Sequence, residues 1–240
     1  MERERYALLD AYMRKCMRDA DGAHDCEHVY RVLGVALDIA GTEPGADADV
    51  VIAACLLHDI ARRDQLRDKH ICHAERGAEK AGKFLRKHGF GEDFARRVAD
   101  CVRTHRFRKG GAPQGIEAQI LYDADKIDVC GAMGIARTLL YQGRANGALY
   151  ATLPDGSLAD GLGEKGETFF GEYRRKLEGI YSRLFTARAR EIARERQAAA
   201  QAFYGSMLAE VRASRENGRV LLQAHLTGSL PAGEPCEAKL

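Results

Sequence analysis

Long hydrophobic stretches are absent from this sequence of 240 residues. The longest, residues 50–57, is far shorter than the roughly 20 residues that a membrane-spanning helix needs. The first ten residues, MERERYALLD, are charged and lack the apolar stretch of a signal peptide. The sequence therefore predicts a soluble, cytoplasmic protein that does not bind a membrane.

A large excess of one charge is also absent. Lysine and arginine number 37 and aspartate and glutamate 35, so the formal net charge is only +2. A basic tail that binds nucleic acid, or a strongly acidic solvating chain, would be far less balanced. We therefore expect no nucleic-acid polymer among the partners of this protein.

Paired cysteines are missing as well. The seven cysteines are odd in number and scattered, and no CxxC pair occurs among them. This spacing excludes a zinc ribbon and disfavours a secreted disulfide scaffold. We expect reduced thiols, most of them packed as small buried hydrophobic groups.

Helical spacing of apolar residues dominates the rest of the chain, and no segment has the alternation of a strand. The pattern predicts an all-α protein. The expected helices cover residues 29–40, 50–60, 74–85, 94–105, 116–140, 167–184 and 188–215.

The chain reads as a single helical domain over residues 1–217. We expect a core at about 20–142, a glycine-rich loop at 143–166, C-terminal helices at 167–217 and a flexible tail at 218–240. The C-terminal helices could cover the core or form a homodimer, and the sequence does not choose between these arrangements.

One polar pair ends the most apolar helix. His58 and Asp59 close the run AACLLHD, where an imidazole and a carboxylate are costly to bury unless something satisfies them. A divalent metal does so, and this donor pair suits Mn, Fe, Ni, Co or Zn. His28 precedes the pair by thirty residues and Asp125 follows it in the run DADKID, each on its own expected helix.

These residues resemble the pattern H…HD…D of the HD-domain superfamily of metal-dependent phosphohydrolases. Three flanking runs resemble the small bacterial HD hydrolases in particular: HDCEHVYRV from His24, ADKIDVCGAMG from Ala124 and TARAREIARER from Thr186. The resemblance covers roughly residues 20–212 and implies an HD-type helical bundle with additional C-terminal helices.

The resemblance implies that His28, His58, Asp59 and Asp125 hold one divalent ion, which could be Mn, Ni, Fe, Co or Mg. Four protein ligands leave positions for a water molecule and a phosphate oxygen, and Asp59 could also orient that water. The implied reaction is hydrolysis of a small phosphoester or phosphoanhydride, plausibly of a nucleotide.

Two basic residues adjoin this set. Arg31 lies three residues after His28, on the same helical face, and could clamp a substrate phosphate. Lys126 follows Asp125 and could bind substrate or stabilise developing charge. Support or capping roles are open for the neighbouring polar residues His24, Asp25, Asp123 and Asp128.

His73 and His105 fall between the HD pair and Asp125, the order in which dinuclear members of the superfamily bind a second ion. They could instead contact phosphate or protonate the leaving group. With two irons the chain would be a di-iron oxygenase, and without turnover it would be a nucleotide-sensing module. The complete ligand set argues against the sensing module, because a decayed site usually loses a ligand first.

Overall fold

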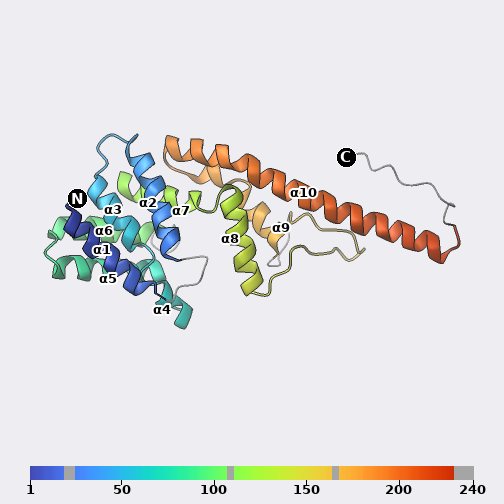
Figure 1. Ribbon diagram of the computed structural model, residues 1–240, viewed down its shortest axis with the longest axis horizontal. Coiled ribbons are helices and arrows are strands. Elements are labelled where there is room, and N and C mark those ends of the chain that lie inside the picture. The colour runs from blue at the N-terminus through green and yellow to red at the C-terminus, as the bar shows by residue number, and fades with distance from the viewer. Residues whose placement is uncertain (19–24, 107–110, 164–167, 230–240) are drawn as a thin grey trace.

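The structure is a computed structural model that describes residues 1–18, 25–106, 111–163 and 168–229 (Figure 1). Its α-helices are α1 (Arg3–Cys16), α2 (Cys26–Ala40), α3 (Ala48–Leu57), α4 (Arg62–Arg67), α5 (His73–Lys87), α6 (Glu92–Thr104), α7 (Ile116–Ile127), α8 (Gly131–Arg144), α9 (Phe169–Glu172) and α10 (Ala187–Leu226). A π-helical turn (Tyr173–Leu177) and a 3-10 turn (Ile180–Arg183) connect α9 to α10. The described residues contain no strand, only two isolated bridges, so the all-α prediction is confirmed.

Helix α3 is the centre of the bundle. The side chain of Asp47 accepts hydrogen bonds from the backbone N–H groups of Asp49 (3.0 Å) and Val50 (3.3 Å) and so caps its first turn. The helix is apolar on all sides, and it packs against α1, α2, α6 and α7. His58 and Asp59 follow its last residue and are therefore held at one end of the bundle core.

The other metal-type side chains come from the ends of neighbouring helices. His28 lies in the first turn of α2, where Asp25 caps the helix by accepting the His28 N–H (2.9 Å). His73 begins α5, His105 follows α6, and Asp125 is in the last turn of α7. Helix packing thus brings five short segments of the chain to one place.

A second hydrophobic cluster lies outside this bundle. It joins α8, α9 and α10 with part of the glycine-rich segment, through residues such as Ile135, Leu158, Phe170 and Tyr204. At Gly161 the backbone has a φ of +85°, and a Cβ atom there would lie 2.3 Å from the carbonyl oxygen of Phe170. The segment therefore needs glycine at this point to pack on α9.

Helices α1 and α4 were not among the expected helices, and two connections also differ from the prediction. The helix expected to run from 116 toward 140 is two helices, because the chain turns after Ile127 and Gly131 has a φ of +65°. The helix expected at 167–184 is also interrupted. Of that range residues 168–184 are described, and they form α9, the π-helical turn and the 3-10 turn.

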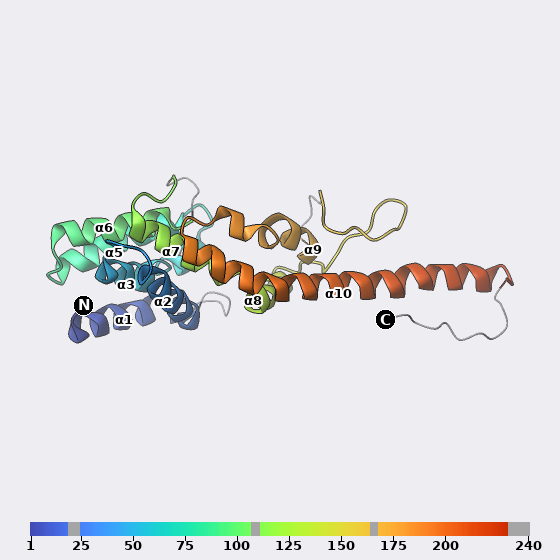
Figure 2. The same ribbon diagram turned by 90° about the horizontal axis from the view of Figure 1, so that it is seen from above.

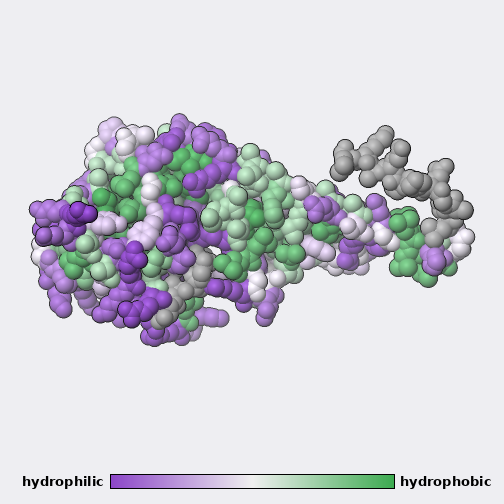
Figure 3. All heavy atoms as spheres, in the orientation of Figure 1, coloured by the Kyte–Doolittle hydropathy of each residue, from purple (hydrophilic) through white to green (hydrophobic). Residues whose placement is uncertain are grey.

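Helix α10 is longer than expected and extends away from the bundle (Figure 1). It continues to Leu226, past the predicted start of the tail at 218; residues 230–240 lie outside the described part. Exposed apolar side chains gather at its far end (Figure 3): Val220, Leu221, Leu222 and Leu226.

The homodimer and the domain bounds that the sequence suggests stay predictions. Within the described ranges, no helix is both long and apolar enough to cross a membrane.

Candidate metal centre

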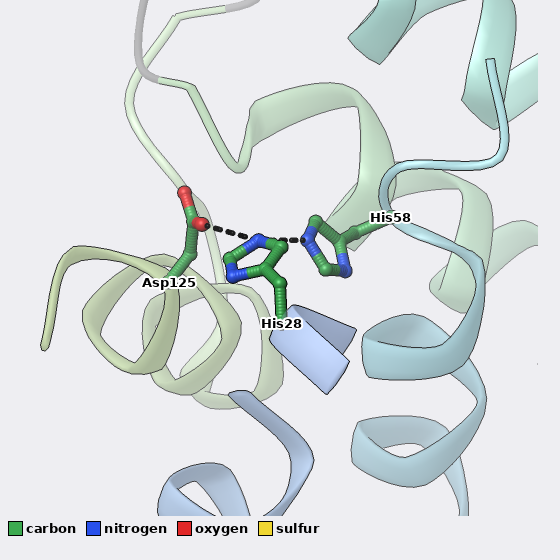
Figure 4. Close-up of side chains that lie close together, drawn as sticks. All are labelled: His28, His58 and Asp125. Carbon is green, nitrogen blue, oxygen red and sulfur yellow. Dashed lines mark hydrogen bonds and ion pairs between the residues drawn. The ribbon is translucent and has the colours of Figure 1, made fainter. Parts of the chain in front are cut away.

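Two clusters of potential ligands lie side by side in the bundle core. The first contains His28, His58 and Asp125 (Figure 4). His28 Nε2 lies 3.3 Å from His58 Nε2 and 3.5 Å from Asp125 Oδ1. Both imidazoles are buried, whereas the side chain of Asp125 is 17% exposed. The cluster therefore opens toward solvent on the Asp125 side.

The second cluster contains Asp59, His73 and His105. The Nε2 atoms of His73 and His105 lie 3.2 and 3.8 Å from Asp59 Oδ1. All three side chains are buried. The sequence left several roles open for His73 and His105. In the structure both lie beside Asp59 of the HD pair.

Asp59 connects the two clusters. Its Oδ1 atom faces His73 and His105, and its Oδ2 atom lies 3.8 Å from the Nε2 atoms of both His28 and His58. One carboxylate with an oxygen toward each group is the arrangement of a ligand shared by two ions. The predicted ligand set of His28, His58, Asp59 and Asp125 therefore does not form one cluster. Asp59 lies between the cluster of His28, His58 and Asp125 and the imidazoles of His73 and His105.

All four histidines present Nε2 to this centre because Nδ1 is engaged elsewhere. The Nδ1 partners are Asp128 Oδ2 for His28 (2.7 Å), the carbonyl of Cys55 for His58 (2.7 Å), the carbonyl of Val102 for His105 (2.6 Å) and the amide oxygen of Gln65 for His73. Since the oxygens beside His28, His58 and His105 accept, Nδ1 of these three residues carries the proton and Nε2 keeps its lone pair.

Burial favours the neutral form of three of these imidazoles. It lowers the pKa of His73 to about 4 and that of His105 to about 3, and it also lowers the pKa of His58. The pKa of His28 is raised, because its hydrogen bonds to Asp125 and Asp128 outweigh the effect of burial. Neutral imidazole is the form that binds a metal, so the second cluster needs no deprotonation near pH 7.

The carboxylates stay ionised. Burial would raise the pKa of Asp59, but Arg62 and His58 hold it well below its usual range. Burial likewise opposes ionisation of Asp125, and Lys126, whose Nζ lies 2.6 Å from Asp125 Oδ2, keeps the pKa low together with His28. Ionised oxygen ligands beside neutral nitrogen ligands are the donors that divalent transition metals bind.

His73 tests whether these residues fit a metal. Its Nε2 atom is fully buried, and although Asp59 Oδ1 lies 3.2 Å away, the two atoms do not have the geometry of a hydrogen bond. A buried polar atom without a partner is costly, and a metal ion would satisfy it. The donor set of four imidazole nitrogens and two carboxylates therefore fits a divalent ion, or two.

Arg31, for which the sequence predicts a contact with phosphate, is paired with Asp128 in the structure. Its Nε and Nη2 atoms donate to Asp128 Oδ1 (2.8 Å) and Oδ2 (3.1 Å). Arg137 also donates to Asp128, which in turn holds His28 Nδ1. Arg31 is therefore linked to His28 through Asp128.

Changing Asp128 to asparagine is expected to weaken metal binding about 10–100-fold, the usual effect of altering the partner of a ligating histidine. The amide keeps the shape but removes the negative charge that makes His28 a stronger donor. Titration of the metal-free protein with Mn²⁺, followed by calorimetry, measures the change. Asp100→Asn, at an exposed carboxylate paired with Arg103, is the matched control; equal affinities in the two variants would contradict the role of Asp128.

A pocket of about 470 Å³ opens onto the two clusters. Asp59, Asp125, His73 and His105 form part of its wall. Six basic residues also line it: Arg62, Arg106, Lys126, Arg137, Lys176 and Arg183. In a chain with a net charge of +2, this is a strong local concentration of positive charge, which attracts an anionic ligand.

The sequence reasoning reached some of this pocket and missed the rest. Lys126, which the sequence predicted to bind substrate, lines it. Gln65, Lys176 and Arg183 were not foreseen, since no motif or helical spacing links them to the histidines. Asp123 supports the fold: its buried carboxylate accepts from the N–H groups of Phe185 and Thr186. His24 lies outside the described residues.

Known proteins show the same architecture. Residues 26–130 match the family model of the HD domain. A predicted HD superfamily hydrolase from an uncultured Thermotogales bacterium is 29% identical, with a TM-score of 0.59 over 84% of this chain and 90% of its own. This chain contains an HD domain at residues 26–130.

Two comparisons concern YpgQ of Bacillus subtilis, a protein without an assigned function. The sequences are 28% identical over 192 residues, which are 78% of this chain and 84% of YpgQ. The crystal structure of YpgQ in complex with ADP has a TM-score of 0.67 and 23% identity over 86% of this chain and 95% of that one. This likeness to the YpgQ structure establishes a shared fold.

Proposed function

We propose that this protein is a divalent-metal-dependent phosphohydrolase that cleaves a small phosphoester or phosphoanhydride, with a nucleotide as the best candidate substrate. One observation carries the proposal: a pocket lined by six basic side chains opens onto two clusters of metal-type ligands. The ADP bound by the related protein YpgQ agrees with a nucleotide as ligand.

The proposal places one ion with His28, His58, Asp59 and Asp125 and a second with Asp59, His73 and His105. Such ions activate a bound water and neutralise phosphate charge. Because Nε2 of His73 and of His105 faces Asp59 and both imidazoles are neutral near pH 7, we assign them to metal binding. A proton-donor role would need a protonated imidazole.

The chain's own charged groups would bind and orient the substrate. Lys126 lies in the pocket wall beside Asp125, with its Nζ 5.1 Å from the centre of the Tyr122 ring. The Nη1 atoms of Arg62 and Arg106 lie 3.5 and 3.3 Å from His73 Nδ1. These positions suit contacts with phosphate oxygens close to the reacting bond.

The geometry also fits a di-iron oxygenase, since one carboxylate lies between two ligand groups. The basic pocket favours the hydrolase, because a cationic wall serves phosphate and is not needed to bind oxygen. Metal analysis together with oxygen consumption separates the two activities.

Assays of the protein loaded with Mn²⁺, Fe²⁺, Co²⁺, Ni²⁺ or Mg²⁺ test the proposal. The substrates are nucleoside mono-, di- and triphosphates and a simple aryl phosphate. We expect release of phosphate or pyrophosphate from at least one of them, and its loss on chelation. A fully loaded protein that hydrolyses none of these compounds would refute the hydrolase, and oxygen uptake by a two-iron form would support the oxygenase. Ligand binding without turnover would indicate the sensing module.

A further inference from the structure

The segment between α9 and α10 forms one wall of the pocket. Figure 2 shows it running from α9 back toward α7 beside α10. It contributes Lys176, Ile180 and Arg183 to the pocket lining. These residues lie outside the HD domain at 26–130, so this wall is an addition to the metal-binding bundle.

Two contacts hold this segment over the pocket. The buried carboxylate of Asp123 accepts from the backbone N–H groups of Phe185 (2.9 Å) and Thr186 (2.7 Å). The rings of Phe185 and Tyr122 meet edge to face with their centres 5.2 Å apart. Arg183 is two residues before this anchor, so its position relative to Tyr122 in the pocket wall is fixed.

The basic residues of the pocket differ in their partners. Arg62 is ion-paired with Asp59, Lys126 with Asp125 and Arg137 with Asp128. These three cations therefore balance carboxylates of the metal centre and its support.

Arg183 is different. Its guanidinium donates to the neutral carbonyl of Arg175 (3.0 Å), and among the described residues it forms no ion pair. Its charge also reaches the pocket: burial and Asp123 raise the pKa of Tyr122, and Arg183 opposes that rise. Lys176, on the same wall, is ion-paired with Glu172, and Glu172 is also ion-paired with Arg175. Positive charge thus remains on this wall after the inner carboxylates are paired.

A phosphate at the metal centre would be neutralised by the ions, so the charge on the added wall exceeds what one phosphate needs. We propose that Arg183, together with Lys176, binds the phosphate groups of the substrate that do not react. The site then selects a di- or triphosphate over a monophosphate. This inference rests on the proposed function, because it assigns specificity within the same pocket.

Steady-state kinetics of Arg183→Ala test the inference. We expect KM for a nucleoside triphosphate to rise about tenfold, as befits loss of one charge-assisted contact, with kcat within about twofold of wild type. KM for a monophosphate should be unchanged. Arg183→Lys, which keeps the charge, should restore most of the affinity, and Lys176→Ala should act in the same direction with a smaller effect.

Arg175→Ala is the matched control, because Arg175 is an exposed arginine of the same segment between α9 and α10 but does not line the pocket. The inference is wrong if Arg183→Ala behaves like this control, or if it impairs mono- and triphosphates equally. Calorimetric binding of inorganic triphosphate to the metal-loaded protein separates the two proposals. If no substrate is hydrolysed but triphosphate binds about tenfold more weakly to Arg183→Ala than to Arg175→Ala, the hydrolase fails and the role of Arg183 stands. No binding of triphosphate by the loaded wild type would overturn both.

Discussion

Replacing Asp59 with asparagine is expected to reduce turnover about 10³-fold or more and to remove both metal ions. The carboxylate is the one group in the described centre whose oxygens lie within 3.2–3.8 Å of the Nε2 atoms of all four histidines. An amide has the same shape but no charge to offset two divalent ions, and the metal-activated water depends on those ions. Metal analysis and hydrolysis assays on the purified variant measure the two effects.

Variants of single clusters refine this test. Asp125→Asn should weaken the first site alone, and His105→Ala the second alone, so each should retain about one ion per chain. Asp93→Asn is the matched control, since Asp93 is an exposed carboxylate paired with Arg96. Full metal content and wild-type turnover in Asp59→Asn would show that the centre does not work as inferred.

Removing the metal is expected to lower the melting temperature by roughly 10–20 °C. An ion that binds only the folded state adds about 2.7 kcal/mol to the free energy of unfolding at a free concentration of 100 times its Kd, so two ions add about 5 kcal/mol. For a protein of this size each kcal/mol shifts Tm by about 2–4 °C. In the metal-free chain the ionised carboxylates Asp59 and Asp125 are buried or nearly so, which is costly.

Scanning calorimetry of chelator-treated protein, before and after Mn²⁺ is restored, measures this shift. His105→Ala, with one site left, should show about half of it. Metal analysis first has to confirm that the ions are gone. If Tm is then unchanged, the result contradicts the two-site centre.

The sequence by itself determined the fold class and the first ligand set. Apolar residues at helical spacing are a local property, so the bundle helices were predictable, and the spacing of His28, the HD pair and Asp125 indicated the superfamily. Helix ends were less predictable. Gly131 stops a helical pattern through its backbone conformation, and α10 continues beyond 218 although its apolar residues there have no partner in the described chain.

Tertiary structure decided the rest of the site, because its contacts join residues far apart in the sequence. Arg31 meets Asp128 across 97 residues, and His28 meets Asp128 across 100. Helix packing alone turns His73 and His105 toward the second oxygen of Asp59, and it brings Arg183 over the pocket through the anchor at Asp123. Periodicity and motif spacing specify which face of a helix a residue occupies. Which other face it meets depends on how the helices pack, and that packing set the two clusters of potential ligands side by side and placed the basic residues of the pocket wall.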